Sequence, residues 1–285
     1  MGYSSLRSCI DDLEKNGFLI RISKEVDPNL EMASIHLKEF ENSGKAILFE
    51  NVKGSKYPAI SNIFGTVERS NFIFRKSIKK VKKLIDLKMN PINGFKDPIS
   101  SIKSAIYATM ALPKRVSFPN DFEEIQISEI PQIKCWPDDG GAFITLPQVY
   151  SEDVMNPGIM NSNLGMYRIQ ISGNEFLKDK EIGLHYQIHR GIGIHQKHAV
   201  ENGENLKVSI FIGGPPSHTF AAVMPLPDGM SEITFAGILE GRRFRYALKD
   251  GYTISADADF VICGEVSTDL KPEGPFGDHL GYYSL

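Results

Sequence analysis

The first third of the chain alternates between two hydrophobic periods. Residues 30–40 carry apolar side chains at helical spacing, and so does the stretch near the start that holds Leu6, Ile10 and Leu13, with Gly17 as a stop. Residues 18–23 alternate between apolar and polar side chains, and residues 46–49 form a short apolar run, as strands do. This mixture of helices and strands predicts an α/β N-terminal domain.

Residues 68–88 predict another helix with one apolar and one basic face. The apolar face holds Ile78, Val81 and Ile85, and the remainder is strongly basic, with Arg75, Lys76, Lys79, Lys80, Lys82, Lys83 and Lys88. We expect Lys79, Lys80, Lys82 and Lys83 to face solvent as an ordinary polar helix face. Binding of nucleic acid is the alternative interpretation. Residues 99–112 predict one more helix.

The pattern changes after Pro113, where proline and glycine separate short apolar runs. These runs are residues 143–146, 166–172, 208–212, 232–239 and 260–264. Many short strands with turn residues between them favour a sheet or barrel, so we expect helices to concentrate before residue 113. The predicted domains are an α/β domain over residues 1–115 and a mainly β, barrel-like domain over residues 116–285, with the boundary near 113–125.

The composition is that of an ordinary globular protein. Of 285 residues, 41% are hydrophobic and 24% are charged, which is enough apolar material for a core without disulfides. A net charge of −3 gives no general attraction to nucleic acid. Three cysteines without C-x-x-C spacing fit a reducing compartment. No signal-peptide run or membrane-length apolar stretch occurs, so we expect a cytoplasmic protein, with peripheral membrane association left open.

Four histidines fall within fourteen residues, at His185, His189, His195 and His198. An H-x-x-x-H pair on a helix can bind zinc, but the glutamate of the metalloprotease motif is absent after His185. The glycines at 191 and 193 also argue against a long helix through this cluster. Surface or packing roles are the alternative for each histidine.

Two carboxylates lie five residues apart in a glycine-rich segment, at Glu273 and Asp278. On a turn, both could face one pocket, where two close carboxylates acquire different pKa values and suit acid–base chemistry. Two exposed loop carboxylates are the alternative, and Arg168 is either their partner or a surface residue. Motifs of P-loop, dinucleotide-binding and serine hydrolase proteins are absent.

Taken in order, the motifs of the second half resemble the UbiD family of prenylated-flavin decarboxylases. The resemblance is carried by residues 136–143 (WPDDGGAF), 163–168 (NLGMYR), 189–191 (HRG), 212–216 (IGGPP), 224–229 (MPLPDG), 231–232 (SE) and 273–283 (EGPFGDHLGYY). It is nearly continuous from about residue 130 onward, and the first third is similar to the family's leading α/β domain. The resemblance therefore implies a split-barrel-like flavin-binding domain after the α/β domain.

The resemblance also implies a ligand set for prenylated FMN and its metal. Mn²⁺ would bridge the flavin phosphate to Asn163, His189 and Glu232, a donor set that suits a hard cation. K⁺ would lie alongside, held by backbone carbonyls near Ala221, Ala222 and Met224. Further cofactor contacts fall on Met166, Tyr167, Arg168, His185, Tyr186, Gln187, Arg190 and Gly191.

The catalytic residues that the resemblance implies are Arg168, Glu273 and Asp278. Arg168 would orient the substrate carboxylate and keep Glu273 ionised, and Asp278 would donate the proton that replaces CO₂. The reaction would be non-oxidative decarboxylation of an aromatic or α,β-unsaturated acid. A 4-hydroxy-3-polyprenylbenzoate of quinone biosynthesis is the favoured substrate, and a cinnamate-like acid is the alternative.

Members of the family have a third α/β region after the EGPFG segment, which supplies a lysine near the cofactor and much of the oligomer contact. This chain stops at Leu285. We therefore expect either a partial or shortened decarboxylase, homo-oligomeric when full length and served by a flavin prenyltransferase, or a non-catalytic flavin-binding or assembly subunit that needs a partner.

Overall fold

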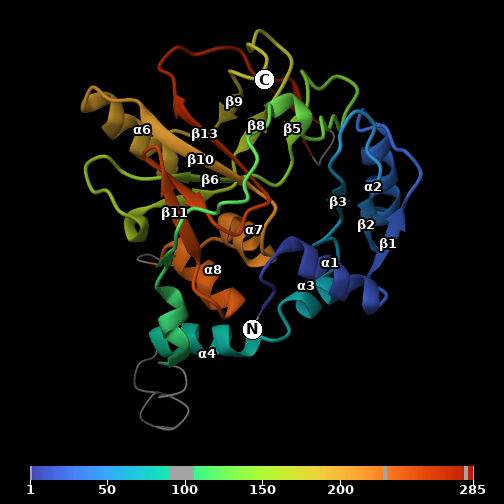
Figure 1. Cartoon of the computed structure of the whole chain (residues 1–285), viewed down its shortest axis with the longest axis horizontal. Helices are drawn as coiled ribbons and strands as arrows, with labels where there is room; N and C mark the ends of the chain where they lie inside the picture. Colours follow the sequence, from blue (N-terminus) through green and yellow to red (C-terminus); the bar gives the residue numbers. More distant parts are fainter. Residues whose placement is uncertain (1, 90–105, 227–229, 279–281, 285) are drawn as a thin grey trace.

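The computed structural model describes residues 2–89, 106–226, 230–278 and 282–284, without the side chains of residues 87–89. Figure 1 shows two parts side by side. We refer to residues 2–89 as the N-terminal part and to the described residues from 106 onward as the sheet-rich part. The predicted helix over residues 99–112 lies largely outside the described residues, but residues 106–111 are helical and end in the 3₁₀ turn η2 (Thr109–Ala111).

The N-terminal part contains one small sheet with strand order β1-β2-β3. Its strands are β1 (Leu19–Ile22), β2 (Ala46–Phe49) and β3 (Ala59–Ser61). The first two strands are parallel, and α2 (Glu31–Glu41) forms the crossover that a parallel pair requires. β3 returns antiparallel to β2. The predicted α/β arrangement is therefore confirmed.

Three more helices complete this part: α1 (Leu6–Lys15), α3 (Val67–Ile73) and α4 (Ile78–Met89). Ser5 caps α1 with a capping box to Ser8. The single helix predicted over residues 68–88 is wrong, because the chain turns between α3 and α4. Val81 is buried and Lys79, Lys80 and Lys82 are exposed, as predicted. The predictions for Lys83 and Ile85 are wrong, because Lys83 is half-buried and Ile85 is exposed. The side chain of Lys88 lies outside the described residues.

The sheet-rich part contains several open sheets. The largest has strand order β13-β10-β6-β7 and the next two are β12-β11-β4 and β5-β8-β9, with a small β14-β15 hairpin near the C-terminus. The bounds are β4 (Lys114–Arg115), β5 (Phe143–Ile144), β6 (Gln148–Ser151), β7 (Asn163–Gly165), β8 (Arg168–Gln170), β9 (Gly183–His185), β10 (Leu206–Ile212), β11 (Arg245–Lys249), β12 (Tyr252–Ser255), β13 (Phe260–Val266), β14 (Phe276–Gly277) and β15 (Tyr283–Ser284).

Helices are more frequent after residue 113 than we predicted. The sheet-rich part contains α6 (Gly191–Glu201), α7 (Pro216–Val223) and α8 (Glu232–Glu240), together with short 3₁₀ turns η3 (Ile127–Glu129) and η4 (Ile159–Asn161). The strand predicted over residues 232–239 is wrong, because this run is α8. Its residues are buried nearly all round, so the run lacks the polar face that reveals a helix by its period.

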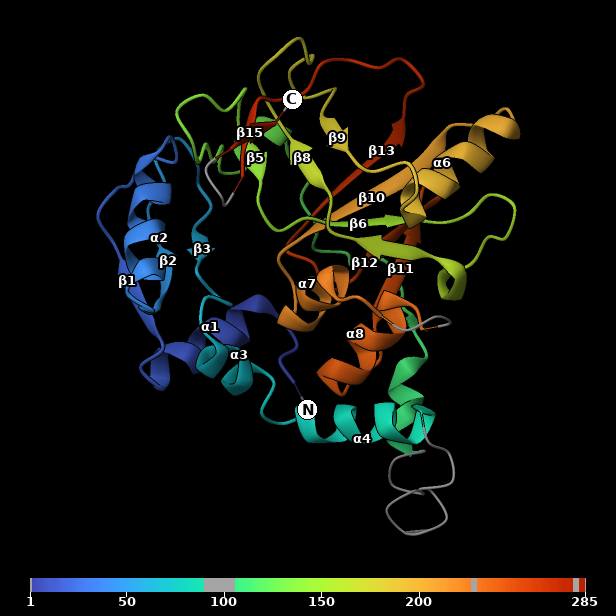
Figure 2. The ribbon, with the colours of Figure 1, turned by 180° about the vertical axis from the view of Figure 1, so that it is seen from behind.

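The strands of the sheet-rich part form no closed barrel within the residues that the structure describes. In Figure 2, α7 and α8 lie against one face of the four-stranded sheet, and α6 crosses near β10. A hydrophobic cluster under α6 and the sheet holds Ile169, Ile192 and Ile210. None of the described helices is long and apolar enough to cross a membrane.

The two parts share their largest core. Leu13 of α1 and Leu48 of β2 belong to the same buried cluster as Phe235 of α8. The first residues of the chain also attach to the sheet-rich part, because the Gly2 amide donates to the Glu240 carbonyl (2.5 Å) and Arg242 donates to the Ser4 carbonyl (3.2 Å). Within the sheet-rich part, β4 is the first strand along the chain, and it pairs in parallel with β11.

Candidate functional site

A buried ion pair joins two segments of the sheet-rich part that are far apart in sequence. Arg168, in β8, donates from Nη2 to Glu273 Oε2 at 2.5 Å, and the two side chains are only 14% and 10% exposed. The guanidinium carbon lies 4.9 Å from the centre of the Phe276 ring. A charge-assisted contact with so little solvent is short and strong. The structure thus brings together two of the three predicted catalytic residues.

His185 belongs to the same cluster. It lies opposite Arg168 in the β8–β9 ladder, and Arg168 Nη2 donates to its Nδ1 at 3.0 Å. Its Nδ1 is 3.4 Å from Glu273 Oε2, and nearly half of its side chain is exposed. Arg168 Nη1 donates to Ser284 Oγ at 2.7 Å. An acceptor Nδ1 places the ring proton on Nε2, so the imidazole can offer a donor to a ligand.

The Arg168–Glu273 pair keeps unused hydrogen-bonding capacity. Arg168 Nε and Glu273 Oε1 are both buried and have no hydrogen-bond partner among the described residues. Buried polar atoms without partners are rare in folded proteins and often occur where a ligand or water completes the site.

The segment that carries Glu273 is held by the loop before β5. Asp139 is 4% exposed and accepts three backbone hydrogen bonds, from Gly277 (2.7 Å), Trp136 (2.9 Å) and Cys135 (3.2 Å). The Gly140 amide donates to the Pro275 carbonyl at 2.7 Å. A Cβ at Gly140 would lie 1.9 Å from the Gly274 carbonyl oxygen, so only glycine permits this approach. Asp139 therefore positions Glu273, a role that the sequence did not reveal.

Asp278 follows β14 directly. Its amide donates to the Tyr282 carbonyl (2.9 Å), and its Oδ1 accepts from the Tyr282 amide (3.0 Å). Its backbone and its carboxylate therefore both help to form the turn. That Asp278 shares a pocket with Glu273 stays a prediction.

Two of the three predicted metal ligands lie close together. Asn163, in β7, exchanges hydrogen bonds with the Tyr167 hydroxyl, with Nδ2 donating at 3.1 Å. Glu232, the first residue of α8, accepts from the amide of Leu164 at 3.3 Å. Burial raises the pKa of the Glu232 carboxyl above its usual value. Among the described residues, no lysine, arginine or histidine forms an ion pair with Glu232.

His189, the third predicted metal ligand, is exposed just before α6. The start of α6 touches Asn163, because a Cβ at Gly191 would lie 2.3 Å from Asn163 Oδ1. No group of three or more His, Cys, Asp or Glu residues in the described part of the chain is arranged to hold a metal. The metal ligand set of Asn163, His189 and Glu232 therefore stays a prediction. It includes an asparagine side chain, which such a group of His, Cys, Asp and Glu residues leaves out.

The remaining residues predicted to contact the cofactor and K⁺ form contacts among themselves. The Met166 amide donates to the Ala222 carbonyl at 3.0 Å, and the Met224 amide donates to the Ala221 carbonyl at 3.3 Å. The Tyr167 and Tyr186 rings meet edge to face at 6.4 Å. Arg190 precedes α6 and donates from Nε to Gln187 Oε1 at 3.3 Å.

The other two histidines of the cluster, His195 and His198, lie on α6, which begins at Gly191. His195 is buried, with Nδ1 2.9 Å from Ser151 Oγ, and His198 Nδ1 lies 2.9 Å from Asp153. Both histidines therefore attach α6 to the end of β6. As expected, no helix runs through the whole cluster, because α6 begins only after His185 and His189.

Comparisons with known proteins agree with the family resemblance. A profile described as the 3-octaprenyl-4-hydroxybenzoate carboxy-lyase N-terminal domain (UbiD_N) matches residues 10–88, and the Rift-related domain of the same enzyme (UbiD) matches residues 112–285. A Chlamydia pneumoniae protein, named as one subunit of a 4-hydroxybenzoate decarboxylase, is 38% identical over 291 residues, covering 99% of this chain and 48% of that protein. The chain thus spans about half the length of the curated relatives it matches.

Among solved structures, Sedimentibacter hydroxybenzoicus vanillic acid decarboxylase (ShVdcCD) in closed form superposes with a TM-score of 0.82 at 25% identity, covering all of this chain and 59% of that chain. An evolved dimeric form of the UbiD-class enzyme HmfF from Pelotomaculum thermopropionicum, in complex with prFMN, gives a TM-score of 0.78 at 22% identity, covering 99% of this chain and 62% of that chain. At 22% identity, the likeness to HmfF shows a shared fold.

Proposed function

The chain belongs to the UbiD family, and from this membership we propose that it is the prenylated-FMN-binding part of a non-oxidative carboxy-lyase. The observation that carries the proposal is the buried Arg168–Glu273 pair with its unsatisfied polar atoms. The substrate class is an aromatic or α,β-unsaturated carboxylic acid. In this interpretation the sheet-rich part is a split-barrel-like flavin domain of residues 116–285, and residues 1–115 form the N-terminal domain.

The chain's own residues divide the work around the substrate. Arg168 binds and orients the substrate carboxylate, because a guanidinium matches a carboxylate with two parallel hydrogen bonds. Glu273 holds the guanidinium in place. Asp278 acts as the general acid and donates the proton that replaces CO₂. When bound, prenylated FMN supplies the electron sink.

The residues around Asn163 fit a divalent metal such as Mn²⁺. Glu232 offers a partly buried carboxylate with no cationic partner among the described residues, and Asn163 offers an amide oxygen beside it. These are hard donors, and the exposed imidazole of His189 completes a set that manganese accepts. The carbonyls of Ala221, Ala222 and Met224 would hold K⁺. Met166, Tyr167, His185, Tyr186, Gln187, Arg190 and Gly191 would contact the flavin.

The names of the relatives bear on the substrate. The matching profiles belong to an enzyme of 3-octaprenyl-4-hydroxybenzoate, and the Chlamydia relative is named for 4-hydroxybenzoate. We therefore propose a 4-hydroxybenzoate, with or without a polyprenyl chain, as the substrate and quinone biosynthesis in the cytoplasm as the setting. A flavin prenyltransferase would supply the cofactor.

A second candidate function is that of a flavin-binding or assembly subunit. Two observations favour this function. The chain spans about half the length of its relatives, and the Chlamydia relative is named as one subunit of a decarboxylase. In this case another polypeptide completes the active site.

One experiment separates these possibilities. The 285-residue chain is co-expressed with a flavin prenyltransferase, and its absorption spectrum, manganese content and CO₂ release from 4-hydroxybenzoate are measured. Bound flavin with CO₂ release supports the carboxy-lyase. Bound flavin without CO₂ release supports the subunit. Protein that carries neither flavin nor manganese contradicts both.

A further inference from the structure

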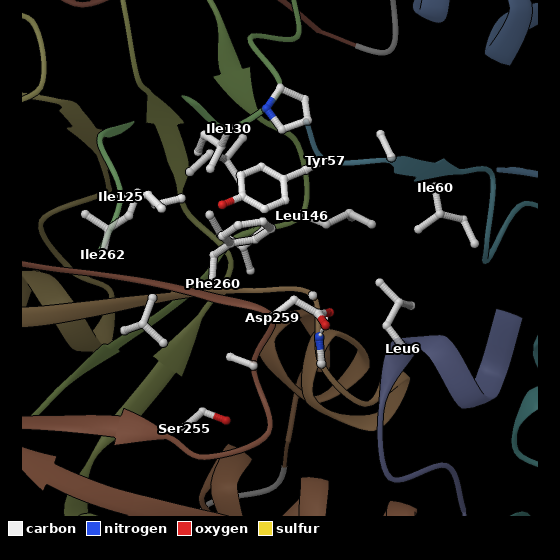
Figure 3. Close-up of a pocket in the computed structure, with 18 of the residues that line it drawn as sticks. Leu6, Tyr57, Ile60, Ile125, Ile130, Leu146, Ser255, Asp259, Phe260 and Ile262 are labelled. Atoms are coloured by element: carbon white, nitrogen blue, oxygen red, sulfur yellow. Dashed lines mark hydrogen bonds between the residues drawn. The ribbon is translucent and has the colours of Figure 1, made fainter. Parts of the chain in front are cut away.

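A large cavity separates the N-terminal part from the sheet-rich part. Its volume is about 1220 Å³, and both parts line it. In Figure 3, Leu6, Tyr57 and Ile60 face it from the N-terminal part, and Phe260 and Ile262 face it from β13. Arg168 and Glu273 do not occur among the described lining residues, so the cavity is distinct from the candidate site.

The lining of this cavity is mostly apolar. Isoleucines from separate elements converge on it, at positions 60, 125, 130, 144, 212 and 262. These side chains are of the kind that fills a core, yet most of them are only half-buried. Pockets for small ligands typically measure roughly 300–1,000 Å³, so this space suits a longer molecule. Apolar surface of this extent is rarely left to water.

The walls of the cavity are firm. β13 pairs with β10 over its full length, from Phe260 to Val266. The Tyr57 ring meets the Phe260 ring edge to face at 4.8 Å and thereby joins the two parts across the cavity. Packed elements therefore form two opposite walls of the cavity.

Most charged residues around the cavity already have partners. Arg21 pairs with Glu50 (2.8 Å), and Lys249 pairs with Glu124 (3.2 Å). Asp259 is exposed and, like Asp121 and Asp250, forms no ion pair within the described part of the chain. Its Oδ2 accepts from the Gly214 amide at 2.8 Å, and Figure 3 shows it between Phe260 and Leu6. A Cβ at Gly213 would lie 2.1 Å from this oxygen, so glycine leaves room for the carboxylate.

We propose that this cavity binds a long apolar molecule with one hydroxyl end, an isoprenoid or acyl alcohol, and that the hydroxyl donates to Asp259. The length follows from the volume, and the apolar character follows from the isoleucine lining. The choice of an alcohol follows from Asp259, because a carboxylate accepts from a hydroxyl and repels another carboxylate. Arg7 also faces the cavity and, like Asp259, is an exposed side chain.

Two fluorescent polyene probes with the same C18 chain test the proposal, parinaryl alcohol and parinaric acid. We expect saturable binding of one alcohol per chain, with the acid weaker by roughly tenfold. Asp259→Asn should remove this preference. Competition by geranylgeraniol or by octadecanol then distinguishes an isoprenoid from an acyl ligand. Equal binding of both head groups, or binding that does not saturate, would overturn the proposal.

Variants that fill the cavity locate the binding. Ile60→Trp and Ile262→Trp, on opposite walls, should each weaken binding of the alcohol by roughly tenfold or more. Leu270→Trp is the matched control, because Leu270 is 93% exposed and does not line the cavity. If a filled variant fails to fold, hydrogen exchange of the unmodified chain decides: the alcohol should slow exchange in β3 and β13. Unchanged exchange there, or an equal effect of Leu270→Trp, would refute the assignment.

Discussion

Asp139 offers a direct test of how the Glu273 segment is held. Replacing it with alanine leaves three backbone N–H groups without their acceptor, those of Cys135, Trp136 and Gly277. Each buried donor left unsatisfied costs about 1–3 kcal/mol, and water can enter to satisfy part of the gap. We therefore expect Asp139→Ala to lower the free energy of unfolding by about 3–5 kcal/mol, a large value for one residue.

The assay is urea unfolding followed by two signals. Trp136 is the only tryptophan of the chain, and its amide donates to Asp139. Its fluorescence therefore reports local opening of this loop, whereas circular dichroism reports global unfolding. Asp138→Ala is the matched control, because the Asp138 side chain is exposed and takes no part in the hydrogen bond from the Asp138 backbone amide to the Tyr283 hydroxyl. If Asp139→Ala lowers the free energy of unfolding by less than about 0.5 kcal/mol, or by no more than Asp138→Ala does, the reasoning is refuted.

Three further predictions concern single residues. Glu232→Ala should lose manganese, measured by elemental analysis, and flavin, measured by its absorption spectrum. The control Glu201→Ala should retain both. A full metal complement in Glu232→Ala would contradict the ligand assignment. Asp278→Asn should bind flavin normally but slow decarboxylation by roughly 10²-fold, the usual scale for a general acid, and unchanged turnover would point to another proton donor. Cys263 is exposed, whereas Cys9 is fully buried and burial raises the pKa of its thiol to about 12. A thiol reagent at pH 8 should therefore label Cys263 first and Cys9 only on unfolding, and early labelling of Cys9 would contradict this packing.

The fold could be predicted where the local pattern and the packing agree. Residues 46–49 form a strand at the predicted bounds, because an all-apolar run bounded by polar residues is buried on both faces. Residues 232–239 have a similar appearance, yet they form α8. Ser231 caps this helix and Gly241 ends it at φ 69°, and these end signals distinguish a buried helix better than the apolar run itself.

The candidate site could be predicted in its residues but not in its supports. The family's motifs single out Arg168 and Glu273, and the structure places them in contact. Asp139 also lies in one of these motifs, but its role depends on a backbone amide more than 130 residues away in sequence. No periodicity or spacing reveals such a contact, because the fold alone decides which amide faces which carboxylate.

The N-terminal part is held to the sheet-rich part by its first residues as well as by the shared core. Gly2 and Ser4 bond to residues around Glu240. A protease that cuts between residues 90 and 105 should therefore yield two fragments that stay associated until denaturant is added. A chain that starts at residue 112 should lack the hydrogen bonds that residues 2–4 form with the Glu240 carbonyl and Arg242, and its α8 should be the first element to loosen.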